Sequence, residues 1–518
     1  MSYRNKKICI VGGGTTGWSA AAFFSKFRKF EVEIVEPKVN DPIGVGESTL
    51  PHLGMFHQAT GFDVFNTNKW LDKVDGTGKF TIEFADFFKK NTKWVHPFFV
   101  NGEDEGKLDA YTHGLIDAPS GAGQYEWVNK TLYLAGLRQE GFKDTENLPY
   151  KNLGYHLDAT LYAKLLKELS LTRDNVKLTH GTVTGIDWDR EDIRSIKLDD
   201  GSVIQADYFL DATGFRSVLN SSKWVSYDKE LYCDRAWTVQ LPYLNEKVQK
   251  RNTTYCHGLE NGWVWNVPLQ SRIGTGYVHS SRHTTAIDAK KEFLTHLNKM
   301  YGYDTSKLQP RLVGFQSGHR KQIWRGNVIS LGLAAFFIEP LESTAIALTQ
   351  SAMEILEPLL TSDHLDMAIR RKRYNKKIIQ RSLQTLDFIS AHYKFSKRDD
   401  SAFWRSSRKV RVRPKVFDLL EVHTDSKRAL TPRYVDQINR VSSGSFFGND
   451  SWGLLFLAYG FPNRPSKHWK ESRREVCMSC EHKITRFGLN VCSLCGCVVH
   501  TKTALKQSTC PDKRWGGV

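Results

Sequence analysis

A glycine-rich turn near the start of the chain could bind a dinucleotide. Gly12, Gly14 and Gly17 have the spacing of the dinucleotide-binding fingerprint and follow an apolar run over residues 8–11. Glycines let the backbone approach a pyrophosphate, and the free N–H groups that begin the next helix favour its negative charge. Glu36 ends the next apolar run, where it would bond a ribose hydroxyl. The alternative is a glycine turn without a ligand, which the combination of strand, helix and acid disfavours.

Cysteines near the C-terminus form a second pattern with chemistry of its own. Six of the nine cysteines lie after residue 476, and two CxxC pairs, Cys477 with Cys480 and Cys492 with Cys495, enclose eleven residues. Paired CxxC motifs in a reducing compartment predict a tetrahedral Zn²⁺ site. Such a zinc tail would be structural or would bind a partner, and two further thiols nearby could substitute as ligands. Redox-active or idle thiols are the alternative.

Strands and helices are needed to position these residues. Residues 6–36 predict a strand, the glycine turn, an amphipathic helix over 18–27 and a second strand over 32–35, which is a βαβ unit. Later apolar runs predict a strand over 176–186. More strands are predicted over 195–198 and 208–210, with a hairpin turn at 200–201. Helices are expected from about residue 350, and a polar linker is expected over 462–475.

Composition favours a water-soluble globular protein. The chain has 518 residues, of which 40% are hydrophobic and 25% charged, so two or three packed units are expected. No apolar run is long enough to cross a bilayer, and the start runs into the glycine turn rather than a cleavage site, which predicts a cytoplasmic location. The net charge of +17 suits a solvated basic surface, with nucleic-acid binding as the alternative.

Three further stretches carry a family resemblance. They are Gly-Val-Gly-Glu-Ser-Thr-Leu-Pro at 44–51, Gly-Trp-Val-Trp-Asn-Val-Pro-Leu at 262–269 and Glu-Pro-Leu-Glu-Ser-Thr at 339–344. Their order resembles that of the flavin-dependent tryptophan halogenase family from residue 6 to about 465. Asp-Ala-Thr-Gly at 211–214 is similar to the second flavin-contacting motif of FAD monooxygenases, which implies FAD rather than NAD. Because the tail is foreign to the usual pattern, a cyanophage-encoded member is an expected relative.

The resemblance implies a fold of the α/β (α+β) class. It has a Rossmann-like FAD-binding domain and an antiparallel substrate sheet interleaved over residues 1–350, followed by a helical region over 351–470. The zinc-binding tail, shaped like a ribbon, would occupy 471–518. The residues expected to bind FAD are Gly12, Gly14, Thr15, Thr16, Gly17, Glu36, Gly46, Glu47, Ser48, Asp211, Gly332 and Leu333.

The resemblance also implies a mechanism. A separate flavin reductase supplies FADH2, and oxygen and halide then yield hypohalous acid, which moves through a tunnel to Lys79. The lysine would orient the oxidant, either as an ammonium or as a haloamine. Glu342 would polarise the oxidant and accept the proton of the substituted ring. The alternatives are a surface lysine at a turn and an acid at the start of a helix.

Two more roles come from the same resemblance. The backbone N–H groups of Thr344 and Ala345 would hold the halide, and Ala345 stands where glycine is usual. The extra methyl group suits a large, weakly hydrated anion, so we expect bromide or iodide rather than chloride. Trp263 and Trp265 would form a barrier that keeps the substrate from the flavin, with aromatic core packing as the alternative.

The substrate is left open by the sequence. Tryptophan, another indole, a phenol and a carrier-bound arene all fit an electrophilic substitution. His96, Pro97 and Phe98 are expected to border the substrate pocket, and Trp452 is expected to stack on the arene. Two other functions are weighed: a flavin-dependent aromatic monooxygenase, which shares the flavin motifs, and a nucleic-acid-binding module built from the basic surface and the tail.

Overall fold

The computed structural model describes residues 5–38, 44–98, 153–424, 445–461, 469–486, 489–504 and 510–512. Every residue predicted above to bind a ligand or to act in catalysis lies within these ranges. Among the helices they contain, none is both long and apolar enough to span a membrane.

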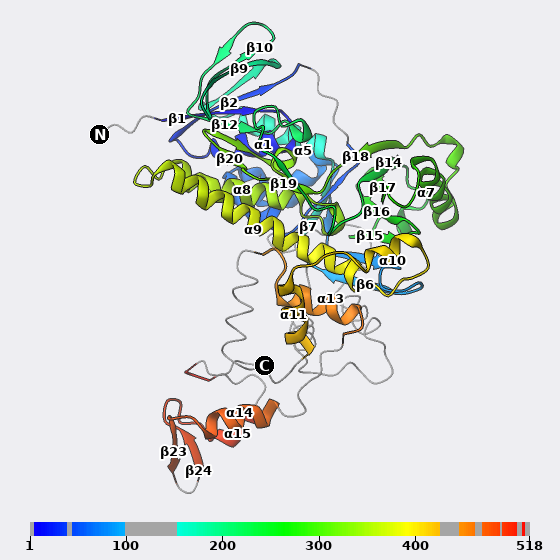
Figure 1. The fold of residues 1–518 in the computed structure, drawn as a ribbon, viewed down its shortest axis with the longest axis vertical. Coiled ribbons are helices and arrows are strands. Elements are labelled where there is room, and N and C mark those ends of the chain that lie inside the picture. Colours follow the sequence, from blue (N-terminus) through cyan, green and yellow to red (C-terminus); the bar gives the residue numbers. More distant parts are fainter. Residues whose placement is uncertain are drawn as a thin grey trace.

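A six-stranded sheet, ordered β20-β21-β12-β1-β2-β8, forms the first part of the fold (Figure 1). β1 pairs in parallel with β2 and β12, so the carboxyl ends of these strands meet at one edge. The strands are β1 (Lys6–Val11), β2 (Phe30–Glu36), β8 (Val176–His180), β12 (Tyr208–Asp211), β20 (Trp324–Arg325) and β21 (Val328–Ser330). The predicted βαβ unit is confirmed, although its helix α1 (Thr15–Phe24) begins and ends three residues earlier than expected.

Both faces of this sheet are buried, which explains the continuous apolar runs. Ile8 and Ile10 pack in the core that contains α1, whereas Cys9 and Val11 pack against a small antiparallel sheet. That sheet consists of β9 (Val183–Asp189), β10 (Asp192–Leu198) and β11 (Val203–Ile204). It lies over the first sheet at the top of Figure 1.

The single strand predicted over 176–186 is wrong. The chain leaves the first sheet after β8 and enters the small sheet as β9, so the two strands belong to different sheets. Gly181 lies at the break, where its N–H donates to the Glu36 carbonyl at 2.9 Å. A side chain at Gly181 would lie 2.8 Å from Leu198, so glycine permits this close approach. The predicted hairpin turn is confirmed, and Gly201 has a φ of 84° there.

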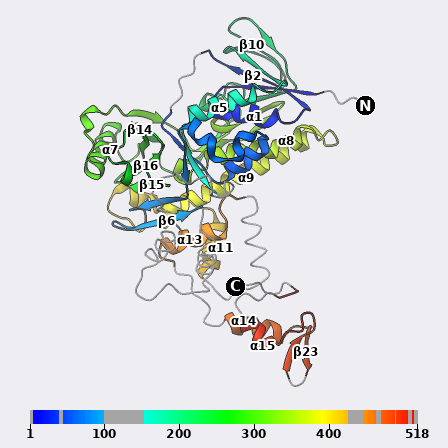
Figure 2. The same cartoon turned by 180° about the vertical axis from the view of Figure 1, so that it is seen from behind.

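A seven-stranded sheet, ordered β18-β14-β17-β16-β15-β5-β6, forms the second part, seen from behind in Figure 2. Its pairs are antiparallel except for β15 with β5, which largely confirms the expected antiparallel sheet. Helix α7 (Ala286–Tyr301) packs on one face through Phe293 and Leu297. The strands are β5 (Thr81–Ala85), β6 (Lys93–Pro97), β14 (Arg235–Leu241), β15 (Thr253–Gly258), β16 (Gly262–Pro268), β17 (Ile273–His279) and β18 (Arg311–Gly314).

A three-stranded sheet, β3-β7-β4, brings the glycine-rich loop next to Lys79. β7 (Gly154–Leu157) is the middle strand and pairs with both β3 (Glu47–Ser48) and β4 (Thr77–Lys79). In its register His156 is opposite Ser48 on one side and Thr77 on the other. Asp158 then caps α5 (Ala159–Ser170) by accepting from two backbone N–H groups.

Helices cover these sheets in the C-terminal part. α9 is the longest and runs from the first sheet toward the second (Figure 1). The helices here are α8 (Ala345–Leu360), α9 (Met367–Lys394), α10 (Ala402–Ser407), α11 (Pro414–Thr424) and α13 (Asn449–Ala458). The remaining elements of the main part are α2 (His52–Thr60), α6 (Glu246–Gln249), β13 (Trp224–Ser226), β19 (Gly318–Arg320) and β22 (Phe336–Phe337).

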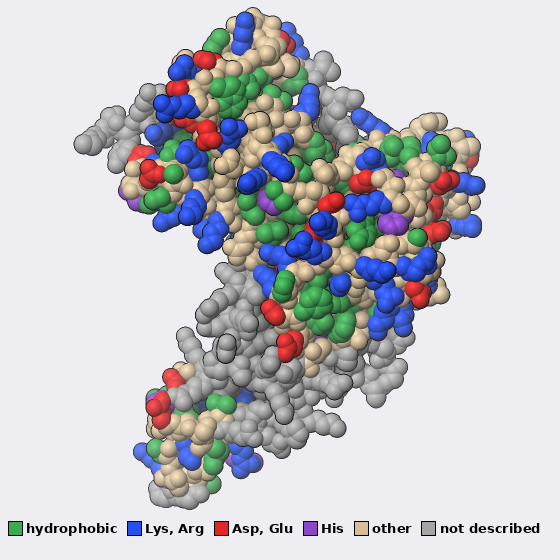
Figure 3. Space-filling model, in the orientation of Figure 1, with side chains coloured by type: hydrophobic (Ala, Val, Ile, Leu, Met, Phe, Trp, Pro, Cys, Tyr) green, Lys and Arg blue, Asp and Glu red, His purple; other side chains and the backbone are tan. Residues whose placement is uncertain are grey.

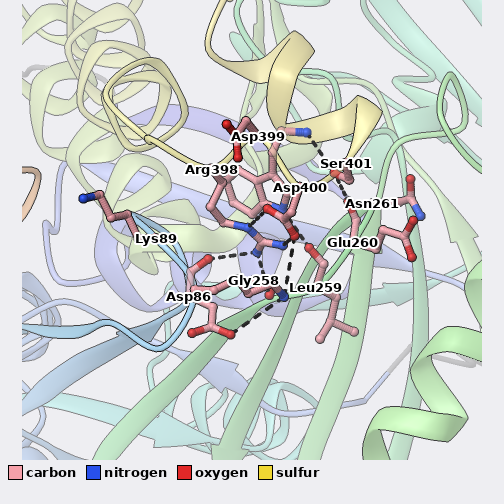
Figure 4. A network of polar contacts seen from close by, with 12 residues as sticks. Asp86, Lys89, Gly258, Leu259, Glu260, Asn261, Arg398, Asp399, Asp400 and Ser401 are labelled. Carbon is pink, nitrogen blue, oxygen red and sulfur yellow. Dashed lines mark hydrogen bonds and ion pairs between the residues drawn. The ribbon is translucent and has the colours of Figure 1, made fainter.

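A buried arginine ties α9 and α10 to the edge of the second sheet. The fully buried guanidinium of Arg398 donates to the carbonyls of Asp86 and Gly258 at 2.9 and 2.8 Å (Figure 4). Its other N–H groups bond both carboxylate oxygens of Asp400, and the plane covers the Trp404 ring. This planar fork holds three segments together, a role that lysine could not fill.

The tail folds as α14 (Trp469–Met478), a hairpin of β23 (Lys483–Arg486) and β24 (Leu489–Cys492), and α15 (Val499–Ala504). The linker predicted over 462–475 is therefore wrong from Trp469 onward, because α14 begins there; residues 462–468 lie outside the described ranges. On the face drawn in Figure 3, lysine and arginine side chains are scattered with acidic ones among them, which is typical of a solvated surface.

Candidate active site

A cavity of about 390 Å³ lies where the glycine turn, the 44–48 loop and the start of α8 meet. The turn supplies backbone at the end of β1, and α8 contributes its first two turns. Most of the residues predicted to bind FAD line it: Gly14, Thr15, Thr16, Gly46, Glu47, Ser48, Gly332 and Leu333. A Cβ at Gly14 would meet no protein atom within 4 Å, so open space lies over the start of α1.

Gly12 and Gly17 shape the turn rather than line the cavity. Gly12 has a φ of 117°, and a Cβ there would lie 2.4 Å from the Ala212 carbonyl oxygen. A Cβ at Gly17 would lie 1.8 Å from the Gly12 carbonyl oxygen. Both positions therefore require glycine for close packing of strand and helix, as the fingerprint predicts.

The two predicted acids, Glu36 and Asp211, are engaged by the protein itself. Glu36 accepts from the Trp18 indole at 3.0 Å and pairs with the Lys167 ammonium, and it does not line the cavity. Asp211 accepts from the backbone N–H groups of Thr213 and Leu219 at 3.1 and 2.9 Å, so it shapes the loop that follows β12. Neither acid lines the cavity, so their predicted role in binding FAD stays a prediction.

Two polar side chains at the start of α8 have no protein partner within the described ranges. Gln350 is fully buried, lines the cavity and leaves both its carboxamide atoms unpaired. The hydroxyl of Thr344, the residue before α8, is also buried and unpaired. Buried polar atoms without partners are rare in folded proteins, so these atoms indicate a polar ligand. The dinucleotide turn and the unpaired carboxamide together fit a flavin.

Gln350 is a residue that the sequence reasoning missed. It follows Ile346, which also lines the cavity, by four residues, so helical periodicity places both on the same face of α8. Extending the motif at 339–344 by one helical repeat would have found it. Glu47 also gains a feature that the sequence did not reveal, because burial raises the pKa of its carboxyl to about 7.

Lys79, the last residue of β4, is fully buried beside this cavity. Its ammonium nitrogen donates to the Thr49 carbonyl at 3.1 Å and to the Ser343 hydroxyl at 2.8 Å, and it lies 4.4 Å from the centre of the Phe98 ring. Burial lowers the pKa of Lys79 to about 7, although Glu342 favours the charged form. The predicted surface alternative for this lysine is therefore excluded.

Glu342 lies between two histidines and is also fully buried. One carboxylate oxygen is 2.8 Å from Nδ1 of His96, and the other is 2.9 Å from Nε2 of His392. Burial alone would raise the pKa of Glu342, but the two imidazoles outweigh it and hold the value at about 2. Glu342 is thus a permanent carboxylate. Glu342 ends a short 3-10 helix, Pro340–Glu342, and lies three residues before α8 begins at Ala345.

Ser343 links the amine to the acid. It follows Glu342 in the chain, accepts from Lys79 and has a φ of 59°, which non-glycine residues rarely adopt. Strain of this kind persists only where surrounding contacts impose it, and it is typical of functional sites. Lys79 therefore bonds the residue that follows Glu342, whereas the paired roles of Lys79 and Glu342 and the tunnel stay predictions.

Aromatic rings surround the amine and the acid. His96 and Phe98 have ring centres 5.3 Å apart, and Phe388 stacks on Phe447 at 3.9 Å. Trp452 meets the edge of Phe388 at 4.9 Å. The sequence prediction named His96, Phe98 and Trp452 but missed the two phenylalanines. Because these rings are apolar and flat, the arrangement suits an arene.

The two tryptophans differ in their surroundings. Trp265 lines the cavity, whereas Trp263 is fully buried behind it with the ring centres 6.2 Å apart. Trp263 lies near Glu339, whose pKa burial raises to about 8 and whose carboxylate accepts from the Tyr393 hydroxyl. Of the predicted pair, Trp265 lines the cavity and Trp263 does not, and the barrier role stays a prediction.

The four predicted zinc ligands lie at two turns of the tail. Cys480 N–H donates to the Cys477 carbonyl at 3.3 Å, and Gly496 N–H donates to the Cys492 carbonyl at 2.8 Å. In the part of the tail that the structure describes, no three of the cysteine sulfurs come within 4.8 Å of one another. The side chains that do so are Glu481, His482 and Asp512. Zinc therefore stays a prediction.

Comparisons with known proteins agree with the site. The tryptophan halogenase family model matches residues 7–474. The tryptophan 6-halogenase ThaL of Streptomyces albogriseolus is 28% identical over 87% of this chain and 86% of its own length. The tryptophan 7-halogenase KtzQ of Kutzneria is 27% identical, with 89% and 91% covered.

Solved structures show the same fold. The flavin-dependent halogenase Xcc4156 of Xanthomonas campestris superposes with a TM-score of 0.74 and 28% identity over 89% of this chain and 90% of that one. A tryptophan halogenase of Shewanella frigidimarina gives a TM-score of 0.76 and 26% identity over 90% of each chain. The mixed α/β fold, the cavity beside the dinucleotide turn and the family match lead to one conclusion: this chain belongs to the tryptophan halogenase family, and it is an enzyme that carries out flavin-dependent halogenation of an aromatic substrate.

Proposed function

We propose that this enzyme halogenates an electron-rich indole or phenol with hypohalous acid that is delivered to Lys79, with Glu342 assisting. The observation that carries the proposal is the placement of a buried amine and a buried carboxylate on either side of Ser343, amid aromatic rings. Neither charge has a structural need to be there, since burying each one costs free energy.

The cavity residues support FAD as the resident cofactor. The turn at Gly14 and the unpaired carboxamide of Gln350 would hold it, with Glu47 and Trp265 along its sides. When bound and reduced by a separate reductase, FAD would supply hypohalous acid from oxygen and halide. Trp265 would then separate the flavin from the arene, so that only the small oxidant passes.

Lys79 would orient the oxidant. Its N–H groups already bond Thr49 and Ser343, and its remaining valence faces the ring of Phe98. A pKa of about 7 makes both the ammonium and the amine accessible at neutral pH. The buried setting also strengthens any hydrogen bond from the nitrogen to the oxidant.

Glu342 would stabilise the cationic ring that forms during substitution and then accept its proton. Its pKa of about 2 keeps it charged at every working pH, which suits electrostatic stabilisation. A weak base is sufficient here, because a ring cation is a far stronger acid than any carboxylic acid. His96 and His392 would hold both oxygens in place during the reaction.

Halide would bind at the start of α8. The backbone N–H groups of Thr344 and Ala345 lie at the positive end of this helix, and Ala345 lines the cavity. The methyl group of Ala345 favours bromide or iodide over chloride. A competition assay with equal halide concentrations tests this preference, and mainly chlorinated product would refute it.

The tail would bind Zn²⁺ through Cys477, Cys480, Cys492 and Cys495. The support is the spacing of the two CxxC pairs and the turn at each pair, where Cys480 N–H donates to Cys477 and Gly496 N–H donates to Cys492. As proposed domains, the flavin and substrate part would span 1–350, the helices 351–470 and the tail 471–518. Metal analysis of the purified protein that finds less than one zinc per chain would refute the site.

One experiment tests the main proposal. The purified protein is combined with FAD, a flavin reductase, oxygen, a panel of indoles and phenols and each halide in turn. The products are then identified by mass spectrometry. A halogenated product that requires halide is the expected result. A hydroxylated product formed without halide would instead indicate an aromatic monooxygenase.

A further inference from the structure

A chain of hydrogen bonds connects Lys79 to a buried histidine behind the cavity. From the amine it passes in order through Ser343, Ser48, Thr254, His156 and Thr77 to the carbonyl of Pro268. The successive distances are 2.8, 3.0, 2.8, 2.8, 3.0 and 2.6 Å. Three of its hydroxyls, those of Ser343, Ser48 and Thr254, also line the cavity.

The far end of the chain fixes the tautomer of His156. A carbonyl oxygen can only accept, so the Thr77 hydroxyl must donate its single proton to Pro268. Thr77 therefore accepts from Nδ1–H of His156. Burial lowers the pKa of His156 well below its usual value, and a neutral imidazole carries one N–H, so Nε2 is an acceptor.

The direction of every other bond follows from this tautomer. The Thr254 hydroxyl donates to Nε2 of His156 and therefore accepts from Ser48. Because the Ser48 hydroxyl donates its single proton to Thr254, it accepts from Ser343. Ser343, in turn, has no proton left for Lys79 and can only accept from it. All hydroxyl protons thus point away from the amine.

This polarity determines how Lys79 presents itself. Its two protein partners, the Thr49 carbonyl and the Ser343 hydroxyl, are both acceptors, so two N–H bonds are fixed in direction. The third valence faces the Phe98 ring, as a lone pair or as a third N–H. We propose that His156 is a positioning residue for Lys79, acting through Thr254, Ser48 and Ser343 to keep the reactive valence of the amine turned toward the substrate side. This inference rests on the proposed role of Lys79 with hypohalous acid.

The test compares halogenated product formed per FADH2 oxidised in the full-length enzyme. Ser48→Ala and Thr254→Val interrupt the chain and free the Ser343 hydroxyl to donate to the amine. We expect the ratio to fall by about tenfold in each, and because product is divided by the FADH2 oxidised, weaker FAD binding alone does not lower the ratio. His156→Phe should lower the ratio equally, and His156→Gln should restore it, because the carboxamide oxygen can accept from Thr254.

A matched control separates this effect from simple loss of a buried hydroxyl. Thr81 bonds Thr253 at 2.7 Å on the neighbouring strands and takes no part in the chain, so Thr81→Val should keep the wild-type ratio. If Ser48→Ala and Thr254→Val also keep it while Lys79→Ala loses product, the positioning role is wrong and the proposed function stands. If Lys79→Ala keeps its product, both are wrong. Ser48→Ala carries the test should His156→Phe fail to fold.

Discussion

The flavin cavity and the region around Lys79 differ in whether their buried polar groups have partners within the protein. The carboxamide of Gln350, which lines the cavity, and the hydroxyl of Thr344, the residue before the lining residue Ala345, lack protein partners in the described part of the chain. Around Lys79, the amine donates to two protein oxygens, and each oxygen of Glu342 lies within 2.9 Å of an imidazole nitrogen, although the contact of Oε1 with His392 lacks hydrogen-bond geometry. One region awaits a ligand to complete it, whereas the other is organised before any ligand arrives. Preorganised groups of this second kind are what stabilise developing charge.

Among the substitutions that test this comparison, Lys79→Ala should reduce product formation the most. Product should fall by at least about 10³-fold, because the oxidant loses the buried amine proposed to orient it, whereas FAD binding should change by less than about twofold. Product is measured by chromatography and FAD binding by fluorescence. Lys89→Ala, at an exposed turn, is the control. Weakened FAD binding in Lys79→Ala would show that the two regions are not separate.

Glu342→Gln should cause the next largest loss of activity. The glutamine keeps the shape and a hydrogen-bond acceptor but removes the charge, so kcat should fall by about 10²-fold. The amide must also turn an N–H toward one imidazole, which exchanges that tautomer. Steady-state kinetics with saturating arene provide the check. An unchanged kcat would mean that another group takes the ring proton.

The pH dependence of stability tests whether the amine is truly buried. The pKa of Lys79 is lowered from 10.5 in the unfolded chain to about 7 in the fold, so the unfolded state binds more protons between these values. The free energy of unfolding of the wild type, relative to Lys79→Met, should therefore rise from pH 7 to pH 10, by about 1–3 kcal/mol. Denaturant unfolding at several pH values measures it. A flat difference would place the amine in water.

Gln350→Leu should show the smallest effect, confined to the cavity. Loss of the carboxamide should weaken FAD binding by about tenfold. The melting temperature of the FAD-free protein should stay equal or rise, since a buried unpaired amide is removed. Titration of FAD and calorimetry of the apoprotein measure the two effects. A melting temperature that drops with unchanged FAD affinity would show that Gln350 supports the fold instead.

The sequence predicted what short stretches determine by themselves. The glycine turn, β1 and the hairpin at Gly201 depend on local spacing, and all three are present. The family motifs also singled out Lys79 and Glu342, which the fold brings together around Ser343. Helix and strand limits were less accurate, because Gly181 ends a strand through a contact with a residue distant in sequence.

What the sequence could not predict depends on partners from remote segments. The environment of Glu342 needs His96 from β6 and His392 from α9, which lie on either side of it in the chain. Asp211 and Glu36 illustrate the converse. Their types suit a cofactor, yet loop N–H groups and the Trp18 indole engage them. No spacing rule contains that information.

β7 pairs with β3 on one side and β4 on the other, and this has a mechanical consequence. Ser48 of β3 and Lys79 of β4 belong to one small sheet, on opposite sides of β7. If an incoming cofactor pushes β3, the amine is carried along with it as one rigid body. Binding of the cofactor at β3 and orientation of the Lys79 amine at β4 would then occur in a single movement.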